Sequence, residues 1–454
     1  MTDNINPRAV ALDIVIEVME KQKLSHVVIK DKLDKLMSLD RQKRGFIVRI
    51  AQGTIEKCIE LDYIIDTFSK VKVKKMKPVI RNIMRISVYQ AKYMDSVPQS
   101  AICNEAVKLA AKRGFSSLKG FVNAVLRSYF REPSKVVYPD KNKDFVRYMS
   151  IVYSVPEWII NMWSEEYGRE KTESMIIASQ KESSVTVRMN SSKVTEEQLF
   201  SEFEEDGIIY ERIEEVNGAF CISGYDTVDK ISAFRKGYIQ VQDVSSMLVG
   251  IVADPHKNNV CIDVCAAPGG KTIHIADMLN GTGSVIARDI SEGKVNRIRE
   301  NIERCGFNNV ECQVWDATVT EKSLYEGADI VIADLPCSGL GVIGRKNDIK
   351  YKTTMQDIEN LAKIQRDILN VVSSYVKPGG TLIFSTCTVN TIENNENVKW
   401  ILENLPFDAE SFEKFIPEKM YHETAKKGYI QYFNGENDMD GFFISRFKKR
   451  MTDE

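Results

Sequence analysis

Apolar residues recur at helical spacing throughout the first 130 residues of the chain. The runs with this periodicity are Ile14, Val15, Val18 and Met19; Ile80, Ile83, Met84 and Val88; Ala106, Leu109 and Ala110; and Phe121, Val122, Val125 and Leu126. Spacings of three and four place such residues on one face of a helix. Helix breakers separate the runs at Pro78, Pro98, Gly114 and Gly120. Residues 5–130 are therefore predicted to form an all-α bundle of about six or seven helices.

The pattern changes over the next hundred residues. Residues 131–156 carry prolines and scattered charge, which is typical of a linker with a short helix. Residues 157–235 mix two periodicities: Val185 to Asn190 favours a strand, and Thr195 to Glu205 favours a helix capped by its threonine. We expect this second stretch to be a small α+β segment.

Strand and helix signals alternate from residue 236 to the end. Short apolar runs that favour buried strands cover 260–265, 284–289, 310–316, 328–334 and 381–387. Helical patterns separate them, for example at 295–305 and 358–376. This alternation predicts an α/β domain with a mostly parallel, doubly wound sheet. Two late runs, 428–433 and 442–447, have no helix between them and favour an antiparallel hairpin at the sheet edge.

These patterns divide the chain into a helical domain (1–130), a linker (131–156), an α+β segment (157–235) and an α/β domain (236–454). The formal net charge of −2 argues at first sight against a polyanionic partner. However, the helical domain has 24 basic and 13 acidic residues, a net of +11, and the remainder has a net of −13. Such asymmetry indicates that one part faces a polyanion, although a basic bundle with a solvated surface gives the same numbers. The α+β segment itself is acidic, at −9.

Nine cysteines without a C-x-x-C pair indicate free thiols and a cytoplasmic protein rather than a disulfide framework. Cys261 and Cys265 lie in an apolar run with no second ligand pair, so no metal site is expected. No stretch approaches about 18 apolar residues. The first four residues lack the basic start of a signal peptide. We therefore expect neither a membrane span nor secretion.

The strongest chemical signal follows the first predicted strand of the α/β domain, where Asp263 to Thr272 reads D-V-C-A-A-P-G-G-K-T. A glycine-rich strand-to-helix turn lets a ligand approach the backbone and points free N–H groups at it. Asp289 ends the second strand, well placed to accept hydrogen bonds from ribose hydroxyls. Because Pro268 breaks the G-x-G-x-x-G pattern and the spacing is not that of a P-loop, a nucleoside without a pyrophosphate fits best. A tight turn without a ligand is the alternative.

Acids and cysteines close the following strands. Asp316 ends the third strand and Asp334 the fourth, while D-L-P-C-S-G and S-T-C-T place Cys337 and Cys387 just after the fourth and fifth. Carboxyl ends of parallel strands meet at one edge, so we expect these side chains to face one crevice. An acid there can be a helix N-cap, and a buried cysteine is most often an inert small hydrophobe. We adopt that interpretation for Cys58, Cys103, Cys221, Cys305 and Cys312. A thiol beside a polar crevice is instead placed to be a nucleophile.

Together these motifs resemble those of the RNA (cytosine-5) methyltransferases. The matching segments are the loop at 263–272, the Pro-Cys motif at 334–339, the Thr-Cys motif at 385–388, and the segments 187–190, 241–246 and 440–444. In the basic bundle, Asn104 to Val107 and Gly120 to Arg127 resemble a NusB-like RNA-binding domain. The combination is similar to the bacterial methyltransferases of small-subunit (16S) ribosomal RNA, and it covers nearly the whole chain.

The resemblance implies a Rossmann-like doubly wound methyltransferase sheet that binds S-adenosyl-L-methionine, preceded by an all-α NusB-like bundle and by an α+β segment that connects them or binds RNA. The implied cofactor-binding residues are Cys265, Ala266, Ala267, Pro268, Gly269, Gly270, Lys271, Asp289, Asp316 and Asp334. By similarity, 265–271 would hold the methionine and ribose side, Asp289 the ribose and Asp316 the adenine. Asp334 would lie beside both the cofactor and the target base.

The resemblance also implies that Cys387 attacks carbon 6 of a cytidine in 16S ribosomal RNA, that Cys337 assists release, and that Asp334 supports nitrogen 3. In the related DNA enzymes the nucleophile lies in the Pro-Cys motif, so the two cysteine assignments can be exchanged; the presence of both motifs favours the RNA type. We expect a monomer that acts on RNA that is unassembled or early in assembly, without a metal ion.

The chain departs from the family pattern in two places. Members commonly show Arg-His-Pro-Asp-Ile-Lys-Trp where this chain has Arg345 to Tyr351, so the basic character is kept but the proline and tryptophan are lost. We expect Arg345, Lys346, Lys350 and Lys352 to contact the RNA backbone, with a solvated loop as the alternative. The same two interpretations apply to the five lysines from Lys70 to Lys77. After the Thr-Cys motif, Thr391-Ile392 replaces the usual Pro-Glu.

Two other functions compete with a methyltransferase. A Rossmann dehydrogenase would need the G-x-G-x-x-G loop and leaves the two cysteines unexplained. A binding module, in which the NusB-like bundle is primary and an inactive methyltransferase serves as scaffold, is opposed by the presence of both cysteines. Transfer of a labelled methyl group to ribosomal RNA would separate these possibilities.

Overall fold

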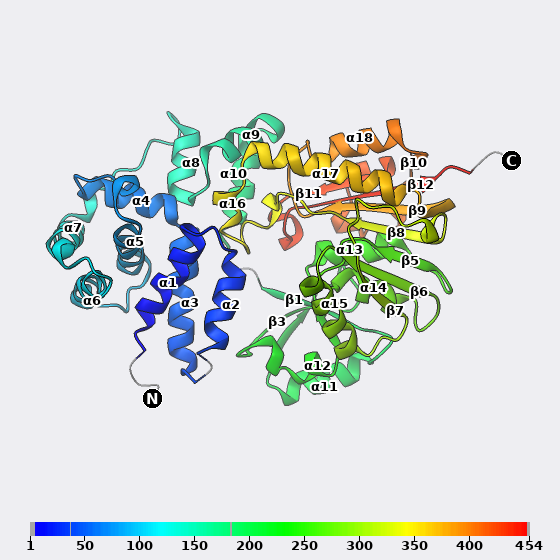
Figure 1. Cartoon of the computed structure of the whole chain (residues 1–454), viewed down its shortest axis with the longest axis horizontal. Coiled ribbons are helices and arrows are strands. Elements are labelled where there is room, and N and C mark those ends of the chain that lie inside the picture. The colour runs from blue at the N-terminus through cyan, green and yellow to red at the C-terminus, as the bar shows by residue number, and fades with distance from the viewer. Residues whose placement is uncertain (1–4, 37, 182–183, 452–454) are drawn as a thin grey trace. The chain divides into compact units, whose positions relative to one another are not determined.

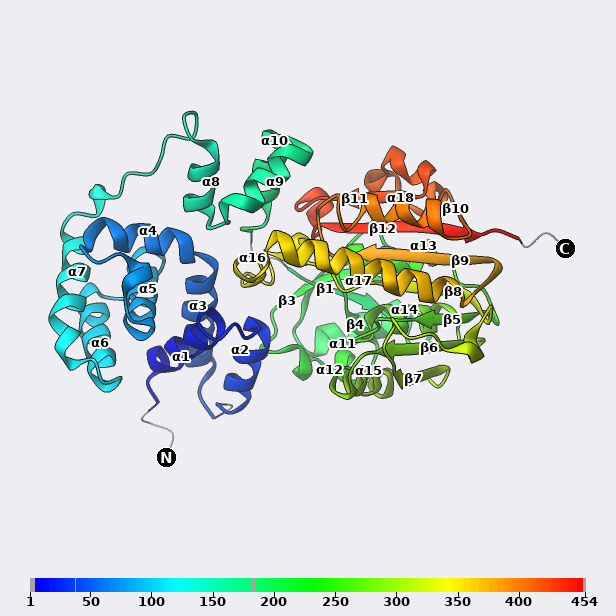
Figure 2. The same ribbon diagram turned by 45° about the horizontal axis from the view of Figure 1, so that its top comes forward.

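The computed structural model describes residues 5–36, 38–181 and 184–451, and it divides into two compact units. The first, called here the helical unit, comprises Met1–Gln180 together with Arg345–Lys352. The second, called the sheet unit, comprises Lys181–Gly344 and Thr353–Glu454. Figures 1 and 2 show the elements of both. Within the described ranges no helix is long and apolar enough to cross a membrane.

The helical unit is built from α-helices, with a longer connection between residues 131 and 145 (Figure 1). They are α1 (Pro7–Met19), α2 (Ser25–Asp34), α3 (Arg41–Glu56), α4 (Cys58–Phe68), α5 (Pro78–Tyr93), α6 (Gln99–Lys112), α7 (Lys119–Arg131), α8 (Phe145–Tyr153), α9 (Glu157–Tyr167), α10 (Arg169–Ala178) and the inserted α16 (Ile349–Lys352). Residues near the N-termini determine where several helices begin. Asn6 caps α1 by accepting from the backbone N–H groups of Arg8 and Ala9, and a proline is the first residue of α1 and of α5. The prediction of an all-α bundle is confirmed.

The core of the helical unit gathers around α5, which packs against α1, α3, α4, α6 and α7. The residues that carry the helical periodicity are buried in it, among them Ile80, Ile83 and Met84. Gly53 of α3 faces Tyr89 of α5, and a Cβ there would lie 2.1 Å from the tyrosine ring. The close approach of these two helices therefore requires glycine.

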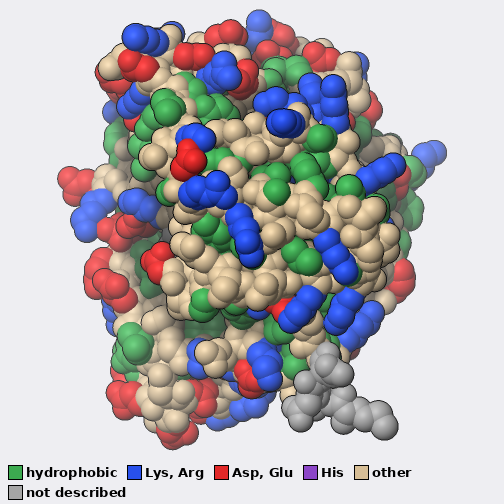
Figure 3. Space-filling model, turned by 90° about the vertical axis from the view of Figure 1, so that its left-hand side faces the viewer, with side chains coloured by type: hydrophobic (Ala, Val, Ile, Leu, Met, Phe, Trp, Pro, Cys, Tyr) green, Lys and Arg blue, Asp and Glu red, His purple; other side chains and the backbone are tan. Residues whose placement is uncertain are grey.

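Figure 3 views the molecule from the end at which the helical unit faces the viewer, and Lys and Arg side chains are spread over the middle of this view. The five lysines from Lys70 to Lys77 are all exposed, whereas Val73 and Met76 of the same run are buried. The run is therefore a surface strip anchored by two apolar side chains, and the ammonium of Lys72 within it pairs with Asp66 (3.8 Å).

The sheet unit begins with a small four-stranded antiparallel sheet in the order β2-β3-β1-β4. Its elements are β1 (Val185–Met189), α11 (Glu196–Glu205), β2 (Ile209–Arg212), β3 (Ala219–Ser223), α12 (Ser232–Arg235) and β4 (Ile239–Val241). The predicted strand at 185–190 and the predicted helix at 195–205 are both present. Thr195 caps α11 in a full capping box with Gln198, as its sequence indicates.

The larger sheet has the order β10-β12-β9-β8-β5-β6-β7, with β11 paired to β12. Its strands are β5 (Val260–Asp263), β6 (Ser284–Asp289), β7 (Val310–Val314), β8 (Ala328–Asp334), β9 (Val376–Thr386), β10 (Phe407–Ala409), β11 (Tyr429–Tyr432) and β12 (Phe442–Lys449). Strands β5 to β9 pair in parallel, and β10, β11 and β12 are antiparallel. The predicted doubly wound α/β fold is confirmed. The late pair does form an antiparallel hairpin, but β12 lies inside the sheet between β9 and β10 rather than at its edge.

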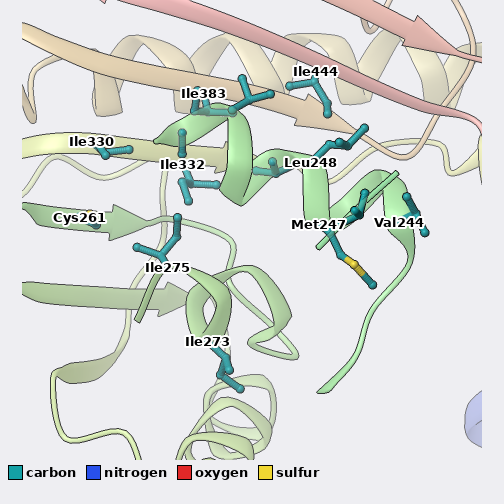
Figure 4. Close-up of a cluster of buried hydrophobic side chains, with 14 of the residues drawn as sticks. Val244, Met247, Leu248, Cys261, Ile273, Ile275, Ile330, Ile332, Ile383 and Ile444 are labelled. Atoms are coloured by element: carbon teal, nitrogen blue, oxygen red, sulfur yellow. The ribbon is translucent and has the colours of Figure 1, made fainter. Parts of the chain in front are cut away.

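Helices cover both faces of this sheet. They are α13 (Val244–Ala253), α14 (Gly270–Met278), α15 (Glu292–Cys305), α17 (Met355–Ser373) and α18 (Asn395–Asn404). Alternate residues of a strand serve opposite faces: Ile330 and Ile332 of β8 pack with α13, α14 and α15, while Val331 packs with α17 and α18. Figure 4 shows the first of these clusters. Two buried layers thus fix the strands, and with them the carboxyl-end edge where the predicted site lies.

Candidate active site

The loop between β5 and α14 is held on the end of β6. The backbone N–H of Ala266 donates to the carbonyl of Arg288 (2.8 Å), and that of Ala267 donates to Asp289 Oδ2 (3.0 Å). Gly269 has φ +104°, in the left-handed region that favours glycine, and its conformation begins α14. The loop is therefore an ordered turn whose shape depends on its glycine and on the acid that ends the next strand.

Asp263, the last residue of β5, carries a buried oxygen that lacks a partner among the described residues. Its Oδ2 accepts from Thr272 Oγ1 (2.7 Å), whereas its Oδ1 is enclosed and has no hydrogen-bond donor. Burial, reinforced by the charges of Asp334 and Asp289, raises the pKa of Asp263 to about 7. An orphaned buried acceptor is costly unless a ligand completes it. The residues present therefore fit a ligand with a cationic donor at this point.

Asp289 and Asp316, the two acids predicted to bind the nucleoside, differ in burial. Asp289 is buried, and besides Ala267 it accepts from the backbone N–H of Ile290 (2.8 Å) and pairs with Lys294 (2.9 Å). Asp316 is exposed and accepts from the backbone N–H and hydroxyl of Thr318, whose hydrogen bonds lower its pKa. The backbone N–H of Trp315 donates to the carbonyl of Asp289 (3.0 Å), which joins the two strand ends.

Asp334, at the end of β8, is paired with a cation and a hydroxyl. Lys271 Nζ donates to its Oδ2 (2.8 Å), and Ser385 Oγ of β9 donates to its Oδ1 (2.7 Å). Burial alone would lower the pKa of Lys271, but the charges of Asp334, Asp263 and Cys387 outweigh burial and raise it. The lysine therefore remains an ammonium at neutral pH, next to both the carboxylate and the thiol.

The two predicted cysteines come together. Strands β8 and β9 are parallel neighbours, with Asp334 opposite Ser385, and the Sγ atoms of Cys337 and Cys387 lie 3.4 Å apart. The hydrogen bond with Cys387 and burial raise the pKa of Cys337 well above its ordinary value, and the charges of Glu393 and Asp334 add to this. Cys337 is therefore a thiol at neutral pH. Cys265, predicted to line the cofactor, is also kept protonated, because burial raises its pKa.

Sequence reasoning missed a set of buried polar residues behind the two cysteines. They are Ser338, Gln365, Ser385, Thr388, Asn390, Glu393, Asn394 and Asn397. Their only sequence signal is an unusual run of asparagines and acids just after the Thr-Cys motif, in a segment that the pattern would otherwise assign to a solvated helix start. Among them, Ser385 contacts the predicted site residue Asp334 directly.

The prediction that Lys350 contacts the RNA backbone is wrong. The segment Arg345–Lys352 belongs to the helical unit, where Lys350 is 1 % exposed and its ammonium donates to the carbonyl of Glu56 (3.0 Å). Lys352 is also engaged there, with Asp348 (2.6 Å) and the carbonyl of Lys23 (2.6 Å). The segment predicted to be a basic RNA-binding loop is therefore bonded to the helices of its own unit through Lys350 and Lys352. Arg345 and Lys346 are exposed, so their RNA contact stays a prediction.

Fold and site together define an α/β methyltransferase with a paired-cysteine centre, and comparison with known proteins agrees. Residues 250–448 match the model of the 16S rRNA methyltransferase RsmB/F family. Residues 5–131 match the NusB family, and residues 155–229 match the ferredoxin-like domain of RsmF/B-like methyltransferases.

Relatives match over almost the whole chain. The probable ribosomal RNA small subunit methyltransferase B of Bacillus subtilis is 35 % identical, over 98 % of each chain. The ribosomal RNA small subunit methyltransferase B of Vibrio cholerae is 28 % identical, over 98 % of each chain. This chain belongs to the ribosomal RNA small subunit methyltransferase B family, and its cofactor is S-adenosyl-L-methionine.

Solved structures share the fold. The crystal structure of PH0851 superimposes with a TM-score of 0.82 at 25 % identity, over 99 % of this chain and 100 % of that one. NSun6 from Pyrococcus horikoshii, solved with SFG, gives a TM-score of 0.58 at 22 % identity, over 65 % of this chain and 98 % of that one. The second comparison extends the shared fold to a protein that matches only about two thirds of this chain.

Proposed function

We propose that this protein transfers a methyl group from S-adenosyl-L-methionine to carbon 5 of a specific cytidine in 16S ribosomal RNA, through a covalent adduct of Cys387 at carbon 6. The observation that carries the proposal is the pair of thiols 3.4 Å apart, next to the Lys271–Asp334 ion pair and at the carboxyl ends of two neighbouring strands. Two inert buried cysteines would not need a neighbouring ion pair. A reaction that uses two thiols at one point accounts for both features.

The chemistry accounts for the nucleophile. Carbon 5 of cytosine is a poor nucleophile until a thiolate adds at carbon 6 and turns the ring into an enamine-like species. The electron pair on carbon 5 then takes the methyl group that the sulfonium of the cofactor supplies. Asp334 would support nitrogen 3 by donating a proton to the charge that addition creates there, and its partner Lys271 would stabilise the carboxylate that remains.

The cofactor residues follow from the loop. The unpartnered Oδ1 of Asp263 suits the α-ammonium of the methionine end, and the backbone of 265–271 encloses the methionine and ribose side. Asp289 would accept from ribose hydroxyls, and the exposed Asp316 from the adenine. The proposed cofactor residues thus run from the end of β5 through β6 to the end of β7, along one edge of the sheet.

Release completes the cycle. Loss of the carbon-5 proton re-forms the ring double bond and breaks the bond between carbon 6 and sulfur, which leaves the electron pair on Cys387. The Cys337 thiol lies within hydrogen-bond distance of that sulfur and can stabilise it as it leaves. A water beside Cys337 would take the proton.

We propose that the basic helical unit holds the RNA while the target base leaves its stack to reach the site. The exposed lysines from Lys70 to Lys77, together with Arg345 and Lys346, supply the candidate phosphate contacts. We further propose domains at 1–130, 157–235 and 236–454 with a linker at 131–156, and a cytoplasmic monomer that acts on unassembled or early-assembling ribosomal RNA.

The first test replaces the proposed nucleophile. Cys387→Ala should abolish transfer of labelled methyl to ribosomal RNA while cofactor binding, measured by calorimetry, stays within about twofold, since Cys387 lies outside the loop. Cys312→Ala, which changes a thiol on β7, a strand that pairs with neither β8 nor β9, is the control. Retained methyl transfer in the Cys387 variant would place the nucleophile elsewhere.

The second test separates the two cysteines. Cys337→Ala should still add to the RNA but should release it poorly, so a covalent RNA–protein adduct should accumulate and survive a denaturing gel. The double variant Cys337→Ala, Cys387→Ala should show no adduct. If the adduct is absent from Cys337→Ala itself, the release role is wrong.

A further inference from the structure

Glu393 lies between the two loops that carry the cysteines. It follows Cys387 by six residues and is 0 % exposed. Its Oε1 accepts from the backbone N–H of Ser338 (2.9 Å) and from Gln365 Nε2 (3.0 Å). Its Oε2 accepts from Asn390 Nδ2 (2.6 Å) and from the hydroxyl of Ser338. One carboxylate thus receives four hydrogen bonds from the Pro-Cys loop, α17 and the Thr-Cys loop.

Every donor that the structure gives Glu393 is neutral. Burying a charge without a cation is costly, and only convergent hydrogen bonds offset that cost. Apolar side chains in place of both the carboxylate and its donors would fill the same space at a lower cost in folding free energy. The carboxylate is therefore better explained by what it holds in place than by a contribution to stability.

The donors of Glu393 are the immediate neighbours of the two thiols. Ser338 directly follows Cys337, and its hydroxyl also meets Thr388 Oγ1 (2.7 Å), next to Cys387. Gln365 links Glu393 to the other side of Cys337, because its Nε2 also donates to the carbonyl of Pro336 (2.9 Å). The residues on both sides of Cys337 are therefore fixed through one carboxylate.

The other loop is fixed from the same side. Asn390 holds Glu393 Oε2, and the backbone N–H of Glu393 donates to Asn390 Oδ1 (2.8 Å), so the turn after Cys387 closes on itself. The backbone N–H of Gly341 donates to the carbonyl of Cys387 (3.1 Å), which ties the end of the Pro-Cys loop to the cysteine of the other. These hydrogen bonds hold the backbone beside both sulfurs, which lie 3.4 Å apart.

We propose that Glu393 is a positioning residue for the release step: its carboxylate holds residues 336–338 so that the Cys337 thiol stays on the Cys387 sulfur as the bond to carbon 6 breaks. In that step the carbon-5 proton passes to water, its electron pair re-forms the ring double bond, and the carbon–sulfur pair returns to Cys387. The inference rests on the proposed function only in assigning Cys337 to release.

The test is Glu393→Gln, which keeps the size but turns one acceptor oxygen into an amide donor that faces other donors. Turnover should fall at least tenfold, and the covalent RNA adduct should accumulate toward the level of Cys337→Ala, while the cofactor Kd stays within twofold. Asp277→Asn is the matched control. Asp277 is a buried carboxylate of the same unit, held by Arg188, Ser191 and Ser192 away from the thiols. It should lower the melting temperature without forming adduct.

A second measurement does not depend on RNA chemistry. Alkylation of Cys337 and Cys387 by iodoacetamide in the free protein, followed by peptide mass spectrometry, reports how well each loop is held. Glu393→Gln should speed alkylation of Cys337 about tenfold, and Asp277→Asn should leave it unchanged. If Glu393→Gln folds poorly, Ser338→Ala removes a single donor and should shift both readouts in the same direction.

The outcomes are distinct. Normal turnover with no excess adduct, or an unchanged alkylation rate, overturns the positioning role of Glu393. An equal amount of adduct in Asp277→Asn would also overturn the positioning role, because the adduct would then result from a general loss of stability. If Cys337→Ala itself yields no adduct, the proposed function fails at its release step, and the alkylation rates still decide whether Glu393 positions Cys337.

Discussion

Lys350 offers a quantitative test of the anchored segment of the helical unit. It is almost completely buried, its ammonium donates to the carbonyl of Glu56, and burial lowers its pKa to about 7. Around it, Tyr351 donates to the carbonyls of Glu56 (2.8 Å) and Ser154 (3.0 Å), and Asp348 accepts from Ser25. Replacement of Lys350 by methionine keeps most of the volume and removes the titrating group.

The magnitude follows from proton linkage. A fall in pKa from the ordinary value of about 10.4 to about 7 corresponds to roughly 4–5 kcal/mol between the charged and neutral forms. Because the unfolded chain binds the proton more tightly than the folded one, the wild-type unit loses stability as the pH falls from about 10 to about 7, and loses no more below that. Removal of the hydrogen bond to Glu56 costs about 1 kcal/mol at every pH.

Lys350→Met should therefore gain stability relative to wild type by about 1.4 kcal/mol per pH unit as the pH is lowered through this window. Urea unfolding of the helical unit can be followed by far-UV circular dichroism between about pH 7 and 9.5. The difference in unfolding free energy between Lys350→Met and wild type should change by about 3 kcal/mol over this range. Lys346→Met, at an exposed position of the same segment, is the control. A difference between wild type and Lys350→Met that does not vary with pH would refute the reasoning.

Three further predictions concern ligands. The affinity for S-adenosyl-L-methionine should fall up to tenfold per pH unit below about pH 7 as Asp263 gains its proton, because a neutral acid no longer attracts the ammonium; calorimetry on Asp263→Asn should show weak, pH-independent binding, and a persistent pH dependence would point to another group. Gly269→Ala should weaken cofactor binding several-fold and cost about 1–2 kcal/mol, because its φ disfavours a side chain; a normal Kd would mean that the loop relaxes. Replacing the five lysines from Lys70 to Lys77 by glutamine should weaken RNA binding and reduce the slope of log K against log salt by about 0.7–0.9 for each phosphate that is no longer neutralised; an unchanged slope would leave the strip as a solvated surface.

The candidate site was predictable to the extent that strand order alone determines it. Asp334 and Cys337 follow one strand and Cys387 the next along the chain, and the two strands are parallel neighbours. Parallel pairing brings their carboxyl ends to one edge whatever the details of packing. For that reason the meeting of the two thiols could be predicted from the alternation of strand and helix signals, together with residues at the strand ends.

The contacts that hold the site could not be predicted in this way. Glu393 bonds to Ser338 from 55 positions further along the chain, and Lys350 bonds to Glu56 from 294 positions away. No local periodicity encodes such partners, and a lysine in a run of charged residues is ordinarily solvated. The same limit explains why the hairpin was predicted at the sheet edge. The pattern of β12 indicates a buried strand, but it does not show which strands β12 pairs with.

The structure bears on the choice between the two cysteines, which motif order alone leaves open. Two thiols 3.4 Å apart cannot both ionise at neutral pH without strong repulsion, so the pair carries one negative charge at most. Asp334 and Glu393 both oppose that charge on Cys337. The ammonium of Lys271 interacts electrostatically with Cys387 and would stabilise a thiolate there. A cation beside Cys387 and two acids that oppose ionisation of Cys337 favour the proposal that Cys387 is the nucleophile.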